Sequence, residues 1–155
     1  MSTSARSPTN CGTALTLLQA AVRRSRCDPS AFAAFCFTDP AGRPLRLIDS
    51  PGHAKHHHAI WDEKSRSWFT GDTFGLSYRE FDTASGPWIM PTTTPTQFDP
   101  SQLKASIVRI MQFRPRRAYL THYSEVGECA RLANDMYDAI DEYVRAMPLQ
   151  ERGAW

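Results

Sequence analysis

A histidine-rich stretch over residues 50–80 constrains this chain most strongly, because it joins strand-like apolar runs to side chains that bind metals. Four of the five histidines of the 155-residue sequence lie in it. An apolar run over 45–49 ends at a Pro-Gly pair, and His53 follows directly. A second run over 67–70 ends at a glycine, and Asp72 follows. A side chain that directly follows a strand is held by a rigid sheet and still faces solvent.

The same pattern recurs later in the chain. Residues 118–121 are predicted to form a short buried strand, and His122 comes directly after it. His53, Asp72 and His122 therefore share one local geometry. Imidazole nitrogens and carboxylate oxygens are ligands that zinc and iron take in proteins. These three side chains are the candidate metal ligands of the sequence.

Length and charge exclude several classes of function. A chain of 155 residues forms one domain at most, and 41% hydrophobic residues provide material for a core. The net charge of +2 is too small for a nucleic-acid-binding surface. The sequence contains no run of 18 apolar residues, so no segment is predicted to span a membrane. We therefore expect neither a nucleic acid nor a membrane as partner.

The four cysteines do not form a recognisable metal site. Cys11, Cys27, Cys36 and Cys129 fit no Cys-x-x-Cys pair and no disulfide framework. We predict free thiols in a reducing compartment, and hence a cytoplasmic protein.

The N-terminal part of the chain differs from the rest. Residues 1–27 carry four arginines and no acidic residue. This composition loosely fits an organellar transit peptide, but a poorly ordered or surface-packed segment is the preferred interpretation. We predict an unmatched segment over residues 1–40, followed by a partial domain over residues 41–150.

From residue 42 onward the sequence predicts regular α/β structure. Asp99-Pro100 favours a helix start, because Asp caps the free N–H groups and Pro suits the first turn. Pro115 closes that helix, and a longer helix with an apolar stripe follows near the C-terminus. The predicted strands are 45–49, 58–61, 67–70 and 118–121, and the predicted later helix is 125–146.

Three short motifs give the chain a resemblance to a known family. Pro51-Gly52-His53, Thr70-Gly71-Asp72 and Thr121-His122 resemble, in the same order, the metal-binding turns of the metallo-β-lactamase fold hydrolase superfamily. Each motif is weak alone, but all three follow predicted strands. The resemblance covers roughly residues 42–147. It implies the C-terminal half of a four-layer αββα sandwich, in which a mixed sheet is flanked by helices.

The resemblance also implies a function and a role for each residue. His53 would be a ligand of the first metal and His122 a ligand of the second. Asp72 would bridge both metals and act as the catalytic residue. The cofactor would be zinc, as one or two ions, with iron or manganese as alternatives. The substrate would be a small-molecule ester, thioester, amide or phosphoester.

The chain departs from the family pattern at one point. Family members begin their site with a His-x-His-x-Asp-His motif, whereas this sequence has no histidine before His53. A truncated gene, a frame error or a split protein would produce this pattern. We expect a hydrolase that is impaired or inactive as an isolated chain, and that needs a homo-oligomer or a complementing chain. A non-catalytic remnant or interaction module that exposes a sheet face is the alternative.

Two further questions stay open at the level of sequence. His53, Asp72 and His122 could gather around one metal instead of two. The run of histidines over 56–58 either contacts the site, as a partner of a ligand, or is a solvated strand start. Similarly, residues 78–80 either meet a substrate or pack within their loop.

Overall fold

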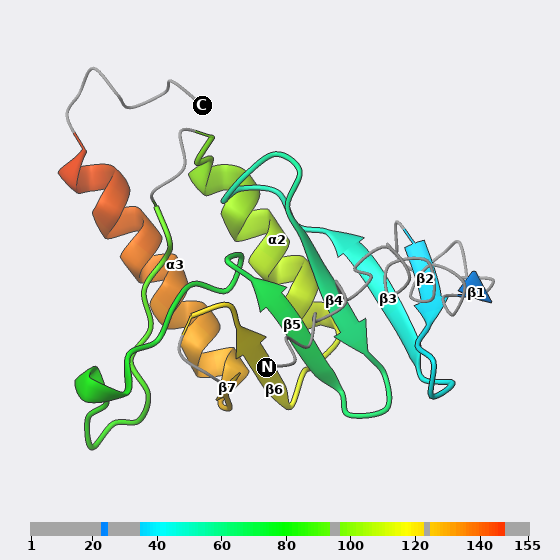
Figure 1. Cartoon of the computed structure of the whole chain (residues 1–155). Coiled ribbons are helices and arrows are strands. Elements are labelled where there is room, and N and C mark those ends of the chain that lie inside the picture. Colours follow the sequence, from blue (N-terminus) through cyan, green and yellow to red (C-terminus); the bar gives the residue numbers. More distant parts are fainter. Residues whose placement is uncertain (1–22, 25–34, 94–96, 123–124, 148–155) are drawn as a thin grey trace, which may run out of the picture.

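The fold is a mixed sheet with two helices (Figure 1). It is seen in a computed structural model that describes residues 23–24, 35–93, 97–122 and 125–147. The four predicted strands and the helix start at Asp99-Pro100 are confirmed. The elements are β1 (Arg23–Arg24), β2 (Phe35–Thr38), β3 (Pro44–Asp49), β4 (His58–Asp62), β5 (Ser67–Gly71), η1 (Arg79–Phe81), α2 (Pro100–Gln112), β6 (Arg117–Leu120), β7 (Glu125–Val126) and α3 (Cys129–Ala146).

The seven strands lie in the sheet in the order in which they occur along the chain. All neighbours are antiparallel except β5 and β6, which are parallel. A parallel pair needs a crossover connection, and α2 lies in the segment that joins β5 to β6. The sheet also includes β1 and β2, which come before the predicted domain start at residue 41.

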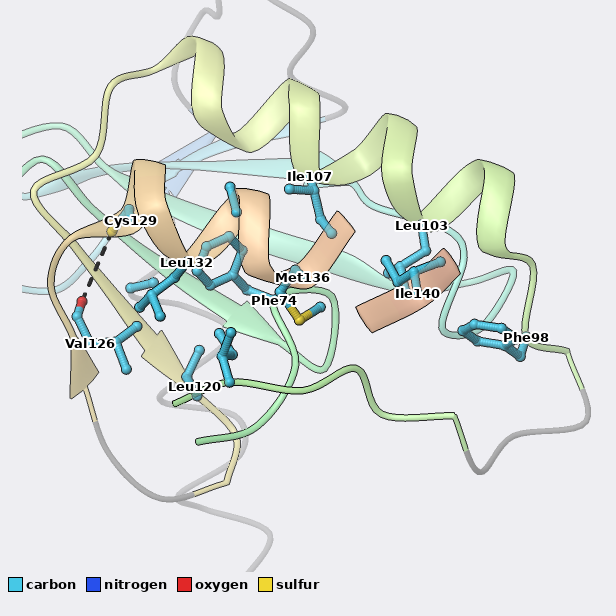
Figure 2. Close-up of a cluster of buried hydrophobic side chains, with 13 residues drawn as sticks. Phe74, Phe98, Leu103, Ile107, Leu120, Val126, Cys129, Leu132, Met136 and Ile140 are labelled. Carbon is cyan, nitrogen blue, oxygen red and sulfur yellow. Dashed lines mark hydrogen bonds between the residues drawn. The ribbon is translucent and has the colours of Figure 1, made fainter. Parts of the chain in front are cut away.

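Both helices pack on one face of the sheet and enclose the larger core (Figure 2). Leu103 and Ile107 of α2 meet Leu132, Met136 and Ile140 of α3, and all five are fully buried. A helix with an apolar stripe is stable only when that stripe is covered, so the sheet and the two helices stabilise one another.

A second cluster lies where α2 ends. The rings of Trp61 and Trp68 lie 5.1 Å apart, and Phe113 lies 5.0 Å from Trp68. Trp68 is completely buried, and its indole N–H donates to the carbonyl of Ile110 at 3.1 Å. Trp68 therefore joins β5 to the C-terminal turn of α2.

The start of α2 follows the sequence prediction. Asp99 is the N-cap, and its carboxylate accepts a hydrogen bond from the N–H of Gln102 at 2.9 Å. Burial alone would raise the pKa of Asp99, but the hydrogen bonds from Gln102 outweigh it and lower that pKa. The cap fixes the end of α2 that lies nearest the candidate site.

The start of the last helix was predicted too early. The prediction placed it near residue 125, but α3 begins at Cys129. Residues 125–126 instead form β7, and Val126 pairs with Ala118 of β6 and is buried. Glu128 has φ 48°, a left-handed conformation that separates the strand from the helix.

The cysteine prediction is correct at one described position and wrong at another. Cys129 is a free, buried thiol. Cys36 is disulfide-bonded, so the free-thiol prediction is wrong at that position. Among the described residues, no helix is long and apolar enough to cross a bilayer.

Candidate metal centre

His53 sits on a turn that is fixed to the N-terminal end of α2. Gly52 has φ +128°, and a Cβ atom there would lie 2.1 Å from the backbone nitrogen of Leu103. The carbonyl of Gly52 accepts from the N–H of Asp99 at 2.7 Å, and the carbonyl of Pro51 accepts from the hydroxyl of Ser106 at 2.6 Å. Gly52 is therefore needed because the helix backbone approaches too closely for any side chain there.

Asp72 sits on the turn that follows β5. Its backbone N–H donates to Nε2 of His57 at 3.0 Å, and its carbonyl accepts from the hydroxyl of Thr92 at 3.0 Å. Gly71, with φ +52°, leaves room for the His57 ring, since a Cβ there would lie 2.6 Å from that ring. Both polar groups of the Asp72 backbone are thus bonded to side chains.

The fold brings the three predicted ligands together. Oδ2 of Asp72 lies 3.6 Å from Nε2 of His53, and Oδ1 lies 3.3 Å from Nε2 of His122. The side chains of His53 and Asp72 are 14% and 22% exposed, whereas that of His122 is 50% exposed. Oδ1 of Asp72 is buried and has no hydrogen-bond partner among the described residues, although His122 faces it.

The hydrogen bonds of His53 suit a metal ligand. Its Nδ1 lies 3.1 Å from the carbonyl oxygen of Thr92 and 3.0 Å from its hydroxyl. A carbonyl can only accept, so a neutral His53 ring carries its proton on Nδ1 and leaves the Nε2 lone pair facing Asp72. A lone pair that faces a carboxylate oxygen is stabilised by a cation between them, so this pair of donors fits a metal.

The three ligands do not form one complete site. Across the described parts of the chain, no three His, Cys, Asp or Glu side chains are grouped so as to hold a metal ion. The two histidines face different oxygens of Asp72. The arrangement offers two positions with two donors each, which is fewer than the three protein ligands of a catalytic zinc site. It therefore does not support the single-metal alternative.

His57 is the one member of the histidine run that reaches the site. Its Nδ1 lies 3.0 Å from the hydroxyl of Ser50 and 2.9 Å from that of Thr73. Burial, followed by the nearby His53 ring, lowers the pKa of His57, although the Asp72 charge opposes this. His56 and His58 are exposed.

Sequence reasoning missed the hydroxyl partners in this site. Ser50 and Thr73 flank the glycine turns, but nothing in the motifs marks them as hydrogen-bond partners of a histidine. Thr92 lies in a run of threonines and prolines, where no spacing signal distinguishes it from its neighbours. It can be found only from the fold, which brings that loop beside His53.

A pocket of about 360 Å³ adjoins His122. Its lining includes Tyr78. Arg79 instead pairs with Asp82 at 3.4 Å and bonds the hydroxyl of Ser77, and neither Arg79 nor Glu80 lines the pocket. The full lining is Leu76, Tyr78, Met90, Pro91, Thr92, Thr93 and His122.

Known proteins give a match in structure but not in sequence. No family profile and no curated protein matches the chain. An archaeal metallo-β-lactamase superfamily protein from Sulfolobus tokodaii matches with 24% identity and a TM-score of 0.52, over 71% of this chain and 37% of that one. A metallo-β-lactamase family protein from Thermus thermophilus matches with 19% identity and a TM-score of 0.54, over 74% and 35%. The chain has part of the metallo-β-lactamase fold.

A more distant match shares this partial fold. The chemotaxis sensor ODP, solved as a peroxy diiron species, matches with 13% identity and a TM-score of 0.50, over 66% of this chain and 47% of that one. The present chain spans little more than a third of the first two proteins and less than half of the sensor.

Proposed function

We propose that this chain supplies one half of a two-metal hydrolytic centre. His53 would hold the first metal, His122 would hold the second, and Asp72 would contribute to both positions. The observation that carries this proposal is that the two oxygens of Asp72 face Nε2 atoms of different histidines, and that the buried Oδ1 has no hydrogen-bond partner in the described parts of the chain. A buried carboxylate oxygen without a partner is costly unless a cation neutralises it.

The chemistry of the donors limits the metal. Imidazole and carboxylate suit zinc, iron and manganese, and the diiron sensor of similar fold adds support for iron. When bound there, such ions polarise a carbonyl or phosphoryl oxygen and lower the pKa of water. The residues of this chain orient the ligand atoms. Thr92 directs the Nε2 lone pair of His53, and the Asp72 carboxylate separates the two metal positions.

The remaining ligands come from outside the described residues. Each position has only two donors, so a second copy or a complementing chain is proposed to complete it. The isolated chain is then a weak metal binder and a poor hydrolase. The substrate class stays as proposed from the motifs: a small-molecule ester, thioester, amide or phosphoester.

Zinc binding by the purified, untagged chain tests the proposal. A chelating indicator dye measures the affinity for Zn²⁺ in wild type, Asp72→Ala and His122→Ala. His56→Ala is the matched control, because His56 is exposed and lies three residues from His53. We expect each ligand variant to bind zinc at least about tenfold more weakly than wild type, and the control to match wild type. Equal affinity in wild type and Asp72→Ala would contradict the proposal.

A second candidate function uses the sheet face that the helices leave open. Four cross-strand partners place apolar side chains in one row on that face, opposite the face that carries Trp68. Phe69 is 44% exposed and stacks on Tyr119, with ring centroids 5.0 Å apart. The row consists of Leu47, Ile60, Phe69 and Tyr119.

We propose that a second copy of the chain binds this face. An uncharged row can meet itself about a two-fold axis, and the small net charge opposes this only weakly. Sedimentation should then show a dimer in wild type and a monomer in Phe69→Lys. Val108→Lys is the control, because Val108 is 48% exposed on α2. A wild-type monomer, or a dimer unaffected by Phe69→Lys, argues against this candidate.

A further inference from the structure

We propose that His57 is a positioning residue for Asp72, and that it acts as a neutral ring with its proton on Nδ1. The role of Asp72 as a ligand rests on the proposed function, whereas the state of the His57 ring does not. His57 reaches the two metal positions through the backbone N–H of Asp72, which lies 3.0 Å from Nε2 of the ring.

The direction of that hydrogen bond fixes the tautomer. A backbone N–H can only donate, so Nε2 of His57 must carry a lone pair. The proton of the neutral ring is then on Nδ1. Two hydroxyl oxygens lie within reach of it, that of Ser50 at 3.0 Å and that of Thr73 at 2.9 Å.

The hydroxyls around Nδ1 are themselves fixed. The Thr73 hydroxyl donates to the carbonyl of Ser50 at 3.1 Å, which leaves its oxygen free to accept from His57. Ser50 and Thr73 are 1% and 0% exposed, so water does not compete for these bonds. The backbone N–H of Ser50 also donates to the carbonyl of His57 at 2.9 Å. The ring therefore joins the end of β3 to the turn after β5.

The turn at Asp72 is held from both sides. His57 accepts from its N–H, and the Thr92 hydroxyl donates to its carbonyl at 3.0 Å. Gly71 has no side chain, so the ring packs directly on the turn. Fixed backbone on both sides orients the carboxylate between the two histidine ligands, as the hydrogen-bond partners of ligands do in metal sites.

Two substitutions at the same position separate positioning from simple loss of packing. His57→Ala removes the acceptor for the Asp72 N–H and leaves a cavity. His57→Gln keeps an amide oxygen that can accept from that N–H, together with an amide N–H₂. The exposed neighbour His56 provides the control, His56→Ala.

The first measurement is made on the metal-free chain at pH 8. Nitrogen-15 NMR of the imidazole rings should show His57 with a bare Nε2 and a protonated Nδ1. Hydrogen exchange of the Asp72 amide should be at least about tenfold faster in His57→Ala, close to wild type in His57→Gln, and unchanged in His56→Ala. A proton on Nε2, or unchanged exchange in His57→Ala, would overturn the proposal.

The second measurement is zinc affinity in the same variants. We expect the zinc affinity of His57→Ala to be about 10- to 100-fold lower than that of wild type. His57→Gln should recover most of this affinity, and the two variants should have similar melting temperatures. Equal losses in the two variants would mean that the ring only fills space, which overturns the positioning role. If wild type binds zinc no better than Asp72→Ala, the proposed metal function fails, and the ring is then judged by the NMR and exchange results alone.

Discussion

The two faces of the sheet differ most clearly at two neighbouring residues of β5. Trp68 is 0% exposed and donates to the last turn of α2, whereas Phe69 is 44% exposed. Because successive side chains of a strand point to opposite faces, one residue packs under the helices and the next faces away from them. The same strand thus contributes to the core on one face and to an open surface on the other.

This difference indicates which face of the sheet contributes more to the stability of the fold. The helix-covered face buries two apolar clusters that contain most of the large side chains of the described chain. The open face has only the row defined above, whose members are partly or largely exposed. The turn that carries His53 is bonded to the start of α2 on the covered face, through the carbonyls of Pro51 and Gly52.

The largest effect is expected at Trp68. Trp68→Ala removes a fully buried ring and the hydrogen bond to Ile110, and it should destabilise the fold by about 3–5 kcal/mol. Phe69→Ala, one residue further, should cost less than about 1 kcal/mol, because its ring is already half in water. Urea unfolding measures both. Similar losses of stability in Trp68→Ala and Phe69→Ala would contradict the conclusion that the two faces contribute differently.

A smaller loss of stability is expected at Gly52, where the His53 turn contacts α2. Gly52→Ala places a Cβ against the backbone of Leu103 at φ +128°, so the turn must move away from α2. We expect a loss of roughly 1–3 kcal/mol and weaker zinc binding through displacement of His53.

Gly42→Ala provides the matched control for that change. Gly42 also has a positive φ, +81°, but a Cβ there meets no atom within 4 Å. It should cost about 1 kcal/mol of backbone strain, and zinc binding should not change. If the two glycine variants behave alike in unfolding and in zinc titration, contact with α2 is not what holds the His53 turn.

The sequence predicted the covered face better than the site. Period-two runs and the Asp99-Pro100 cap are local signals, so the strands and the start of α2 could be found from the sequence alone. The start of α3 was missed, because pairing of Val126 with β6 is a tertiary contact that local helix periodicity does not contain.

The motifs identified the side chains of the site but not their supports. His53, Asp72 and His122 each follow a strand, and the fold brings them together. The roles of Thr92 and His57 depend on loops that meet only in the folded chain. The division of Asp72 between two histidines likewise depends on side-chain directions, which spacing along the chain does not give.

The smallest effect is expected at a buried charge at the end of the open face. Asp62 is 1% exposed and is held by polar contacts instead of apolar packing. Its carboxylate accepts from the Ser65 hydroxyl at 2.6 Å and from Arg43 at 2.9 Å. Burial alone would raise the pKa of Asp62, but these hydrogen bonds and the charge of Arg43 lower it below 3.8.

That shift sets the direction of a pH dependence. The unfolded chain keeps the higher pKa, so it takes up the proton first as the solution becomes acidic. The contribution of Asp62 is therefore complete above pH 3.8 and is lost as the pH falls toward the lower pKa of the folded chain. The effect is small because Arg43 is 43% exposed and its charge is screened by water.

Urea unfolding between pH 5 and pH 3 measures this dependence in wild type and in Asp62→Asn. The variant carries no titrating group at this position, so its stability should fall less steeply with acid than that of wild type. Equal slopes would mean that the carboxylate gains nothing from its partners.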